Sequence, residues 1–206
     1  MEKKKLNIYI VGNEYVGKSS FAKRYLEDTF KKKYLSTIGF NCLIKYIKVG
    51  NQNCSVRLYD FSGSDRYSDI YIYLKKKIDA IIFMYDVTNE SSLNSMEKKW
   101  INVVSEVVKY DCPKFLIGTK IDLEKERSVN EEEGKKLADN YKMDYFEVSS
   151  KSGEKVNETM ESIIKKLLNP NKKVHTFFND TEELDKLYEK VEKKSFWKSL
   201  FNMCKC

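Results

Sequence analysis

The sequence has few of the residues that interrupt a fold or brace it covalently. Its 206 residues include 8 glycines, 2 prolines and a single histidine, His175, so neither long low-complexity linkers nor histidine-based catalysis is expected. Five cysteines are an odd number without framework spacing, which argues against structural disulfides and fits a reducing compartment. No apolar run approaches the roughly 18 residues of a membrane span. The charged amino terminus lacks the apolar stretch of a signal peptide, and the second residue is Glu2 rather than the glycine of a myristoylation signal.

Positive charge is in excess, with a formal net charge of +7 at pH 7. Such a chain is attracted to nucleic acid or to an anionic membrane surface. The sequence has no RNA-binding aromatic signature and no zinc-ligand spacing, so nucleic acid is not expected as a partner. Most of the lysines are interpreted as solvated surface. The length indicates one ordinary domain, or one domain with a tail.

Short apolar runs alternate with helical stretches along the chain. This alternation predicts an α/β fold with a mainly parallel six-stranded sheet and helices on both faces. A turn-rich stretch at Gly50–Asn53 joins two of the runs as a hairpin, which supplies one antiparallel edge strand. The expected strands are Leu6–Val11, Phe40–Val49, Cys54–Tyr59, Ala80–Tyr85, Lys114–Gly118 and Asp144–Val148, and the expected helices are Lys18–Glu27, Ser91–Lys109, Glu131–Tyr141 and Val156–Leu168.

The expected domain ends near residue 170, where Asn169-Pro170-Asn171 follows the last core helix. Residues 171–206 then form a tail. Within it, apolar residues at helical spacing over Leu184–Val191 indicate a tethered amphipathic segment. Whether this segment binds a partner or a membrane is left open.

The strongest motif is an eight-residue loop that matches G-x-x-x-x-G-K-[ST] between an expected strand and an expected helix. Glycines allow such a loop to wrap closely around phosphates, and successive amides with the helix N-terminus form an anion site. Lys18 would neutralise the β- and γ-phosphates and Ser19 would bind Mg²⁺. The loop residues expected to contact the nucleotide are Gly12, Asn13, Glu14, Tyr15, Val16, Gly17, Lys18 and Ser19.

Three further segments follow later strands, at the edge of the sheet where a ligand is expected. Asp60 ends a strand and can hold Mg²⁺ through water, while the Gly63 amide can contact a γ-phosphate. In Thr119–Asp122, the Asp122 carboxylate can accept from N1–H and the exocyclic amine of guanine, and the stem of Lys120 can lie along the base. Backbone amides of Ser149, Ser150 and Lys151 can reach the guanine carbonyl oxygen. These segments together predict guanine-nucleotide binding.

With these motifs, residues 6–170 resemble the Ras superfamily and are most similar to Rab proteins. Ser36–Phe40 resembles switch I, Val56–Asp60 with Arg66-Tyr67 resembles the strand and switch II region, and Tyr85–Thr88 with Trp100 fits Rab spacing. The resemblance implies a P-loop NTPase G domain that binds GTP or GDP with Mg²⁺ held by Ser19, Thr37 and Asp60. The resemblance also implies six further residues that contact the nucleotide: Ser20, Phe30, Tyr34, Ser36, Thr37 and Leu123.

The sequence departs from the family pattern at several functional positions. Ser64 replaces the glutamine that orients the attacking water, so slow intrinsic hydrolysis is expected, with Ser64, Gly63 and Lys18 as the catalytic positions. Glu14 places a carboxylate near the γ-phosphate, where repulsion would weaken GTP relative to GDP unless the side chain points to solvent. Thr119 replaces asparagine, and Leu74–Lys76 replaces a Tyr-Tyr-Arg sequence.

The C-terminal Cys204-Lys205-Cys206 resembles the Cys-x-Cys signal on which Rab proteins receive two geranylgeranyl groups. Two lipid chains anchor a protein stably, whereas one anchors it marginally. The resemblance implies a cytosolic pool and attachment to the cytoplasmic face of an intracellular membrane. It also implies an exchange factor, a GTPase-activating protein, effectors that bind the switch regions, and an escort or GDI-type protein.

Two functions remain open on the sequence. The first is a Rab-type GTP-binding switch in vesicle trafficking, and the second is a membrane-anchored GTP/GDP-binding interaction module with little or no turnover, supported by Ser64 and Glu14. An ATP-using kinase is disfavoured because Asp122 selects guanine. Such a kinase would also need several arginines, whereas the sequence has only Arg24, Arg57, Arg66 and Arg127.

Overall fold

The computed structural model describes residues 4–32, 36–50, 52–64, 78–108 and 112–168. Within these ranges a single sheet has the strand order β2-β3-β1-β4-β5-β6. β2 runs antiparallel to β3, and the other neighbouring strands are parallel, which confirms the expected mainly parallel sheet with one antiparallel edge strand. The strands are β1 (Lys4–Val11), β2 (Phe40–Val49), β3 (Gln52–Phe61), β4 (Ala80–Asp86), β5 (Lys114–Thr119) and β6 (Asp144–Val148).

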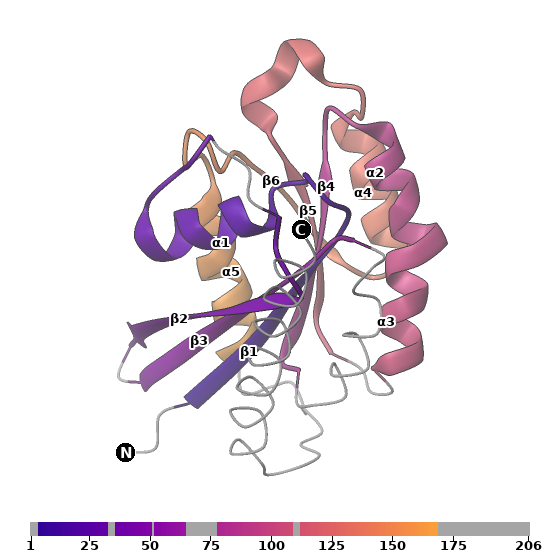
Figure 1. Cartoon of the computed structure of the whole chain (residues 1–206). Helices are drawn as coiled ribbons and strands as arrows, with labels where there is room; N and C mark the ends of the chain where they lie inside the picture. Colours follow the sequence, from indigo (N-terminus) through magenta and orange to yellow (C-terminus); the bar gives the residue numbers. More distant parts are fainter. Residues whose placement is uncertain (1–3, 33–35, 51, 65–77, 109–111, 169–206) are drawn as a thin grey trace, which may run out of the picture. The chain divides into compact units, whose positions relative to one another are not determined.

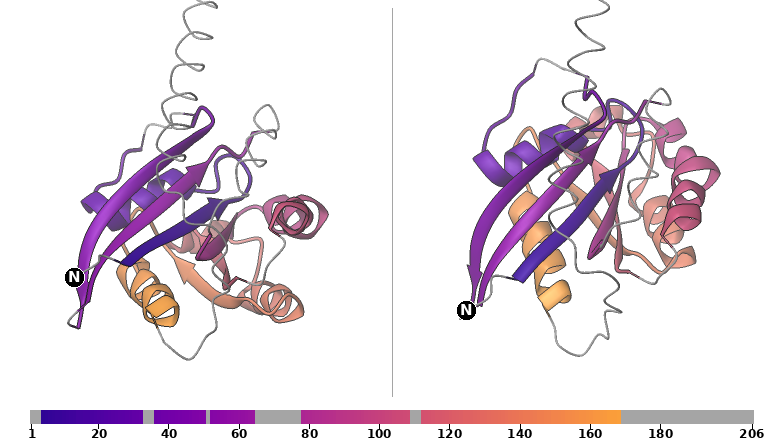
Figure 2. Two further views of the ribbon diagram at one scale, coloured as in Figure 1. Left: turned by 90° about the horizontal axis from the view of Figure 1, so that it is seen from below. Right: turned by 60° about the horizontal axis from the view of Figure 1, so that its bottom comes forward.

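Helices cover both faces of this sheet, as expected (Figure 1). Helices α1 (Lys18–Glu27) and α5 (Val156–Leu168) lie on one face. The other face carries α4 (Glu131–Asn140) and a continuous helix made of α2 (Glu90–Ser95), η2 (Met96–Ile101) and α3 (Asn102–Val107). Figure 2 shows the same two helix layers from below.

Two apolar cores result from the period-two alternation of the central strands. In β1, Ile8 and Ile10 join the core beneath α1 and α5, whereas Tyr9 and Val11 join the core beneath α2–α3 and α4. All four side chains are buried. Because both faces of β1 are covered, the loop that follows its carboxyl end starts from a buried part of the strand.

Two features of the helices differ from the sequence expectation. The expected helix Ser91–Lys109 is instead an α-helix interrupted by the π-helical turn η2, and its described part ends at Val107. A single widened turn leaves the overall helical periodicity of a sequence almost unchanged, so apolar spacing does not reveal it. A 3₁₀ segment, η3 (Ile121–Glu126), was missed because six residues are too short for a periodic signal.

Several expectations concern residues outside the described ranges. These are the nucleotide contact of Tyr34, the switch II segment Arg66-Tyr67, the departure at Leu74–Lys76, the tail segment Leu184–Val191, the domain boundary at residue 170 and the lipidated cysteines Cys204 and Cys206. Across the described part of the chain, no helix has the length and apolarity needed to cross a membrane.

Candidate nucleotide site

The loop between β1 and α1 is shaped by the close approach of neighbouring strands. Gly12 adopts φ +146°, and a Cβ there would overlap the carbonyl oxygen of Met84 in β4. Gly17 adopts φ +99° just before α1, and Tyr15 also has positive φ, at +65°. A residue with a Cβ could not occupy position 12 without moving β4. The backbone therefore turns tightly around the space in front of the helix N-terminus.

Lys18 is the buried cation of this loop. Its ammonium donates to the carbonyl oxygens of Gly12 at 2.7 Å and Asn13 at 2.6 Å, and the side chain is only 6% exposed. Burial lowers the pKa of Lys18 to about 8, although the nearby carboxylates of Asp60 and Glu14 favour its charged form. An ammonium held against the loop beside the pocket is well placed to meet phosphate oxygens.

Ser19, Thr37 and Asp60 come together from three separate segments, as the sequence predicts. The Ser19 hydroxyl donates to Asp60 Oδ2 at 2.6 Å and lies 3.1 Å from the Thr37 hydroxyl, which is itself 3.5 Å from Asp60 Oδ2. Asp60 is fully buried, and this burial raises the pKa of its carboxyl group despite the hydrogen bond from Ser19. Its second oxygen, Oδ1, is buried without a hydrogen-bond partner.

This oxygen cluster fits the Mg²⁺ that Ras-type nucleotide sites use. Mg²⁺ prefers hard oxygen ligands and retains several waters, and the unpartnered Asp60 Oδ1 could accept a hydrogen bond from one of them. Ser19 and Thr37 would supply hydroxyl ligands. When bound, the ion neutralises charge on the β- and γ-phosphates. Over the described ranges, no group of three or more His, Cys, Asp or Glu side chains is arranged to hold a metal ion.

The segment after β3 packs directly against the phosphate loop. A Cβ on Gly63 would overlap the backbone at Asn13 and Glu14, so only glycine fits in this position. The preceding Ser62 donates its N–H to the carbonyl oxygen of Gly39 at 2.8 Å, which joins the two switch regions. The Ser64 N–H lies 3.3 Å from the Ser62 hydroxyl. Gly63 lines the pocket, whereas Ser64 is partly exposed and is not among the lining residues.

The guanine-recognition segment is anchored at both of its charged residues. Lys120 adopts φ +65° at the start of η3, and its ammonium pairs with Asp86 at 2.5 Å. Asp122 Oδ1 accepts a hydrogen bond from the Ser149 hydroxyl at 2.6 Å, and Asp122 Oδ2 lies 3.4 Å from the Lys151 ammonium. The Lys120–Asp86 pair ties this segment to the end of β4, and the contacts of Asp122 tie it to the loop after β6.

Arg24 fixes the backbone of the segment Ser149–Lys151, a role that was not predicted from the sequence. From α1, its guanidinium donates to the backbone carbonyls of Ser150 at 2.8 Å and Lys151 at 2.9 Å. It also pairs with Asp28 at 3.0 Å. Arginine donates in a planar fork, so one side chain can fix the direction of two successive peptides. The only sequence signal was the scarcity of arginine.

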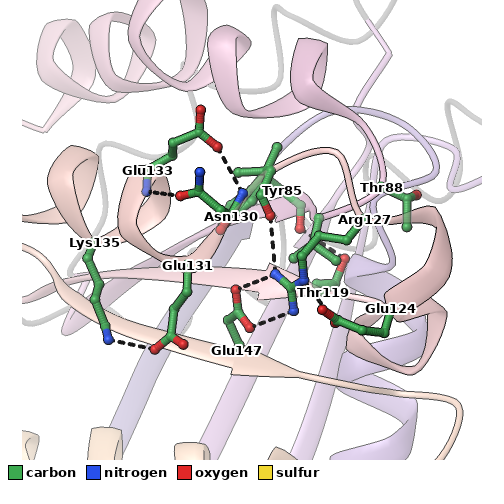
Figure 3. Close-up of polar contacts among 12 residues, drawn as sticks. Tyr85, Thr88, Thr119, Glu124, Arg127, Asn130, Glu131, Glu133, Lys135 and Glu147 are labelled. Atoms are coloured by element: carbon green, nitrogen blue, oxygen red, sulfur yellow. Dashed lines mark hydrogen bonds and ion pairs between the residues drawn. The ribbon is translucent and has the colours of Figure 1, made fainter.

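A second arginine, Arg127, makes several polar contacts near the end of the loop after β5 (Figure 3). Arg127 pairs with both oxygens of Glu147 at 2.9 and 3.0 Å and also reaches Glu124 at 2.9 Å. Glu147 in turn accepts from the Tyr145 hydroxyl at 2.7 Å, and Tyr145 contacts the Tyr85 hydroxyl at 2.8 Å. This pairing with Glu147 raises the pKa of Arg127. The loop after β5 is thereby tied to β6.

A pocket of about 380 Å³ opens at this edge of the sheet. Most residues predicted to contact the nucleotide line it. Six of the predicted residues do not line it: Gly12, Asn13, Glu14, Val16, Ser36 and Ser149. The predicted lining residues are Tyr15, Gly17, Lys18, Ser19, Ser20, Phe30, Thr37, Gly63, Thr119, Lys120, Asp122, Leu123, Ser150 and Lys151, and the unpredicted ones are Lys23, Thr29, Lys31, Lys32, Phe61 and Ser62.

Comparison with known protein families decides how this pocket is interpreted. The model of the Ras family matches residues 7–169. The chain belongs to the Ras family. It is similar to the Ras-related protein Rab-3A of Homo sapiens, with 34% identity over 76% of this chain and 71% of that protein. It is also similar to the Ras-related protein Rab-1 of Theileria parva, with 32% identity over 78% of this chain and 73% of that protein.

The match to Rab proteins extends nearly end to end in one relative. The Ras-related protein Rab-3 of Caenorhabditis elegans is 29% identical over 97% of this chain and 89% of its own length. Together these similarities identify a divergent Rab-type GTPase. Ras-family GTPases bind GTP or GDP with Mg²⁺, and the cradle formed by Lys18, Ser19 and Asp60 has the chemistry that this requires.

Proposed function

We propose that this Rab-type GTPase is a guanine-nucleotide switch with slow intrinsic hydrolysis, which regulates vesicle trafficking from a membrane to which two geranylgeranyl groups anchor it. In such a switch, the γ-phosphate and Mg²⁺ order Thr37 and Gly63 into an effector-binding surface. Loss of the γ-phosphate releases that surface. The ties between Ser19, Thr37 and Asp60 and the packing of Gly63 on the phosphate loop support this part of the proposal.

The residue at position 64 carries the proposal of slow hydrolysis. A glutamine there orients the attacking water toward the γ-phosphate. Serine is much shorter, and Ser64 is partly exposed beside the pocket instead of lining it. We therefore expect hydrolysis on the order of 10- to 100-fold slower than in a Ser64→Gln variant, because water positioning is lost.

The nucleotide that co-purifies with the protein tests this proposal. Bound nucleotide is released by acid from freshly purified protein and separated by ion-exchange chromatography. Wild type and a Ser64→Ala variant should both retain a substantial share of GTP. The Ser64→Gln variant, purified in parallel, should contain mainly GDP. A wild-type sample as poor in GTP as the glutamine variant would reject slow hydrolysis.

The C-terminal cysteines carry the proposal of membrane attachment. Cys204 and Cys206 form a Cys-x-Cys signal, and two buried lipid chains give stable anchoring where one gives reversible binding. In the GDP state, an escort or GDI-type partner would shield these lipids in the cytosol. Exchange factors, activating proteins and effectors would act at the two switch regions.

Enzymatic prenylation of full-length protein tests the anchor. Intact-mass measurement should detect two added geranylgeranyl groups on wild type, one on Cys204→Ser and none on the double serine variant. Flotation with anionic vesicles should retain the doubly modified protein and release most of the singly modified one. Modification of neither cysteine would refute the anchor and leave the nucleotide switch untouched.

Glu14 supports the alternative of an interaction module that rarely turns over. The charge of Glu14 opposes the burial that lowers the pKa of Lys18 in the phosphate cradle, although Glu14 does not line the pocket. Repulsion of the γ-phosphate would then favour GDP over GTP. The test is the ratio of GTP to GDP affinity in wild type and in Glu14→Ser. An unchanged ratio would remove this support, and wild type that loads GDP but not GTP would favour the interaction module over the switch.

A further inference from the structure

We infer that Trp100 and Ser95 are positioning residues for nucleotide binding, and that they act through the side chain of Asn13. Trp100 Nε1 donates to Asn13 Oδ1 at 2.6 Å, and Asn13 Nδ2 donates to the Ser95 hydroxyl at 3.0 Å. Trp100 is completely buried. The α2–η2 helix therefore holds the phosphate loop at Asn13, through two residues that lie more than eighty positions further along the chain.

The hydrogen-bond chemistry of this contact admits only one orientation. Indole N–H is a donor only, so the Asn13 oxygen must face Trp100 and its amide nitrogen must face Ser95. Ser95 meets this requirement because its hydroxyl proton is given to the carbonyl oxygen of Ser91 at 2.7 Å, which leaves an oxygen lone pair for Asn13. Trp100 Nε1, Asn13 Nδ2 and the Ser95 hydroxyl thus each donate to an acceptor in this series of contacts.

The π-helical turn explains how both residues reach the same side chain. Ser95 and Trp100 are five positions apart, which in a regular α-helix places them about 140° apart around the axis. In the widened turn Met96–Ile101, hydrogen bonding from i to i+5 brings such residues toward one side. Single π-helical turns inside α-helices occur frequently at functional sites. The irregular turn in this helix faces the phosphate loop.

The backbone of Asn13 is where the parts of the phosphate cradle meet. Its carbonyl oxygen accepts from the Lys18 ammonium at 2.6 Å, and Gly63 packs against the Asn13–Glu14 peptide. Neither Ser95 nor Trp100 lines the pocket, so neither would touch the nucleotide. Fixing the Asn13 side chain holds this peptide in place. Trp100 and Ser95 therefore set the geometry of the cradle for Lys18 and Gly63.

This inference rests on guanine-nucleotide binding in the pocket and is independent of the hydrolysis rate. Loss of one bond to Asn13 should speed GDP release about 3- to 10-fold, the equivalent of one net hydrogen bond. Affinity for the base should be unaffected, because Asp122 and its partners lie in other loops. The ratio of GDP to inosine diphosphate affinity should then stay at the wild-type value.

The first test compares two serines of the same helix in full-length protein. Ser95 and Ser105 each donate a hydroxyl to the carbonyl four residues earlier, both at 2.7 Å, but only Ser95 also contacts Asn13. Release of a fluorescent GDP analogue with Mg²⁺ present should be 3- to 10-fold faster in Ser95→Ala and unchanged in Ser105→Ala. Equal rates in the two variants would overturn the inference.

The second test is a double-mutant cycle of Trp100→Phe and Asn13→Leu. If Trp100 acts through Asn13, each variant speeds GDP release and the double variant is no faster than Asn13→Leu alone. If the indole has a purely structural role, the two increases in release rate should multiply in the double variant. That result would overturn the inference, whether or not the variants also lose thermal stability. Wild-type protein that binds no GDP would overturn both the inference and the nucleotide function on which it rests.

Discussion

The hydroxyl of Thr119 lies 2.6 Å from the carbonyl oxygen of Val16 and 2.9 Å from that of Tyr85. It thereby ties the start of the guanine-recognition segment to the phosphate loop and to β4. Thr119 is only 1% exposed, so these contacts are made in an environment without competing water. The threonine that departs from the family's asparagine thus joins the two halves of the nucleotide site.

Thr119→Val should loosen both halves of the site. The change keeps the shape of the side chain but removes its hydroxyl, which leaves buried carbonyl oxygens without this donor and costs about 1–3 kcal/mol. We expect a lower free energy of unfolding in urea and faster release of bound GDP. Thr119→Ser, which keeps the hydroxyl, is the matched control. Valine and serine variants with the same release rate would contradict this role.

Glu147→Gln should weaken the brace formed by Arg127 and Glu147. Arg127 and Glu147 are 18% and 11% exposed, and removal of one charge from such a partly buried pair costs about 1–3 kcal/mol. GDP affinity should also fall, because Arg127 holds the loop that carries Asp122. Urea unfolding and GDP titration measure the two effects.

A solvent-exposed ion pair on α4 supplies the control for that experiment. Lys135 and Glu131, visible in Figure 3, are both 56% exposed. Water and salt screen such a pair, so Lys135→Gln should change neither unfolding nor GDP affinity measurably. If the Glu147 and Lys135 variants behave alike, the brace has no special role.

Tyr25→Phe should protect the protein against alkaline unfolding. Burial, with a smaller effect from Glu161, raises the pKa of Tyr25 from its ordinary 10.0 to about 12. The folded state therefore favours the neutral phenol. This stability is fully present below pH 10 and is lost as the pH rises through 12.

The phenylalanine variant cannot ionise, so its advantage over wild type should grow across the same pH range. At pH 11 the difference should be about 1.4 kcal/mol, the equivalent of one pKa unit. Urea unfolding curves at pH 8 and pH 11 measure it. A difference between the two proteins that is constant with pH would show that Tyr25 titrates normally.

Gly63→Ala should impair the response to the γ-phosphate. An added Cβ would overlap the Asn13–Glu14 backbone, so Gly63 would have to move away from the phosphate loop. GDP affinity should stay close to that of wild type, while GTP affinity falls roughly 10-fold or more through loss of an amide bond to a charged group. Equal loss for both nucleotides would instead indicate general damage to the loop.

The sequence predicted those parts of the fold and site that local signals encode. Helix α1 was expected at Lys18–Glu27 and forms there, because a glycine loop precedes it and an apolar stripe runs along it. Asp60 and Thr119 were placed near the phosphate loop because all three follow or end strands of one parallel sheet. Spacing within a strand and order along the chain were sufficient for these residues.

Contacts between residues distant in the sequence could not be predicted in this way. Arg127 pairs with Glu147 across 20 positions, and Trp100 bonds Asn13 across 87. Such pairs depend on helix rotation and sheet register, which no local pattern specifies. The widened turn around Trp100 was also missed, because a single such turn leaves the apolar spacing of the helix almost unchanged.

Single-turnover hydrolysis of GTP tests the central proposal most directly. Wild type, Ser64→Gln and Ser64→Ala are loaded with GTP by nucleotide exchange, and the bound nucleotide is followed by chromatography after addition of Mg²⁺. GTP should persist on wild type and the alanine variant, while the glutamine variant should hydrolyse it on the order of 10- to 100-fold faster. Wild-type hydrolysis as fast as that of the glutamine variant would contradict the proposed role of Ser64 in slow hydrolysis, because another group would then orient the water.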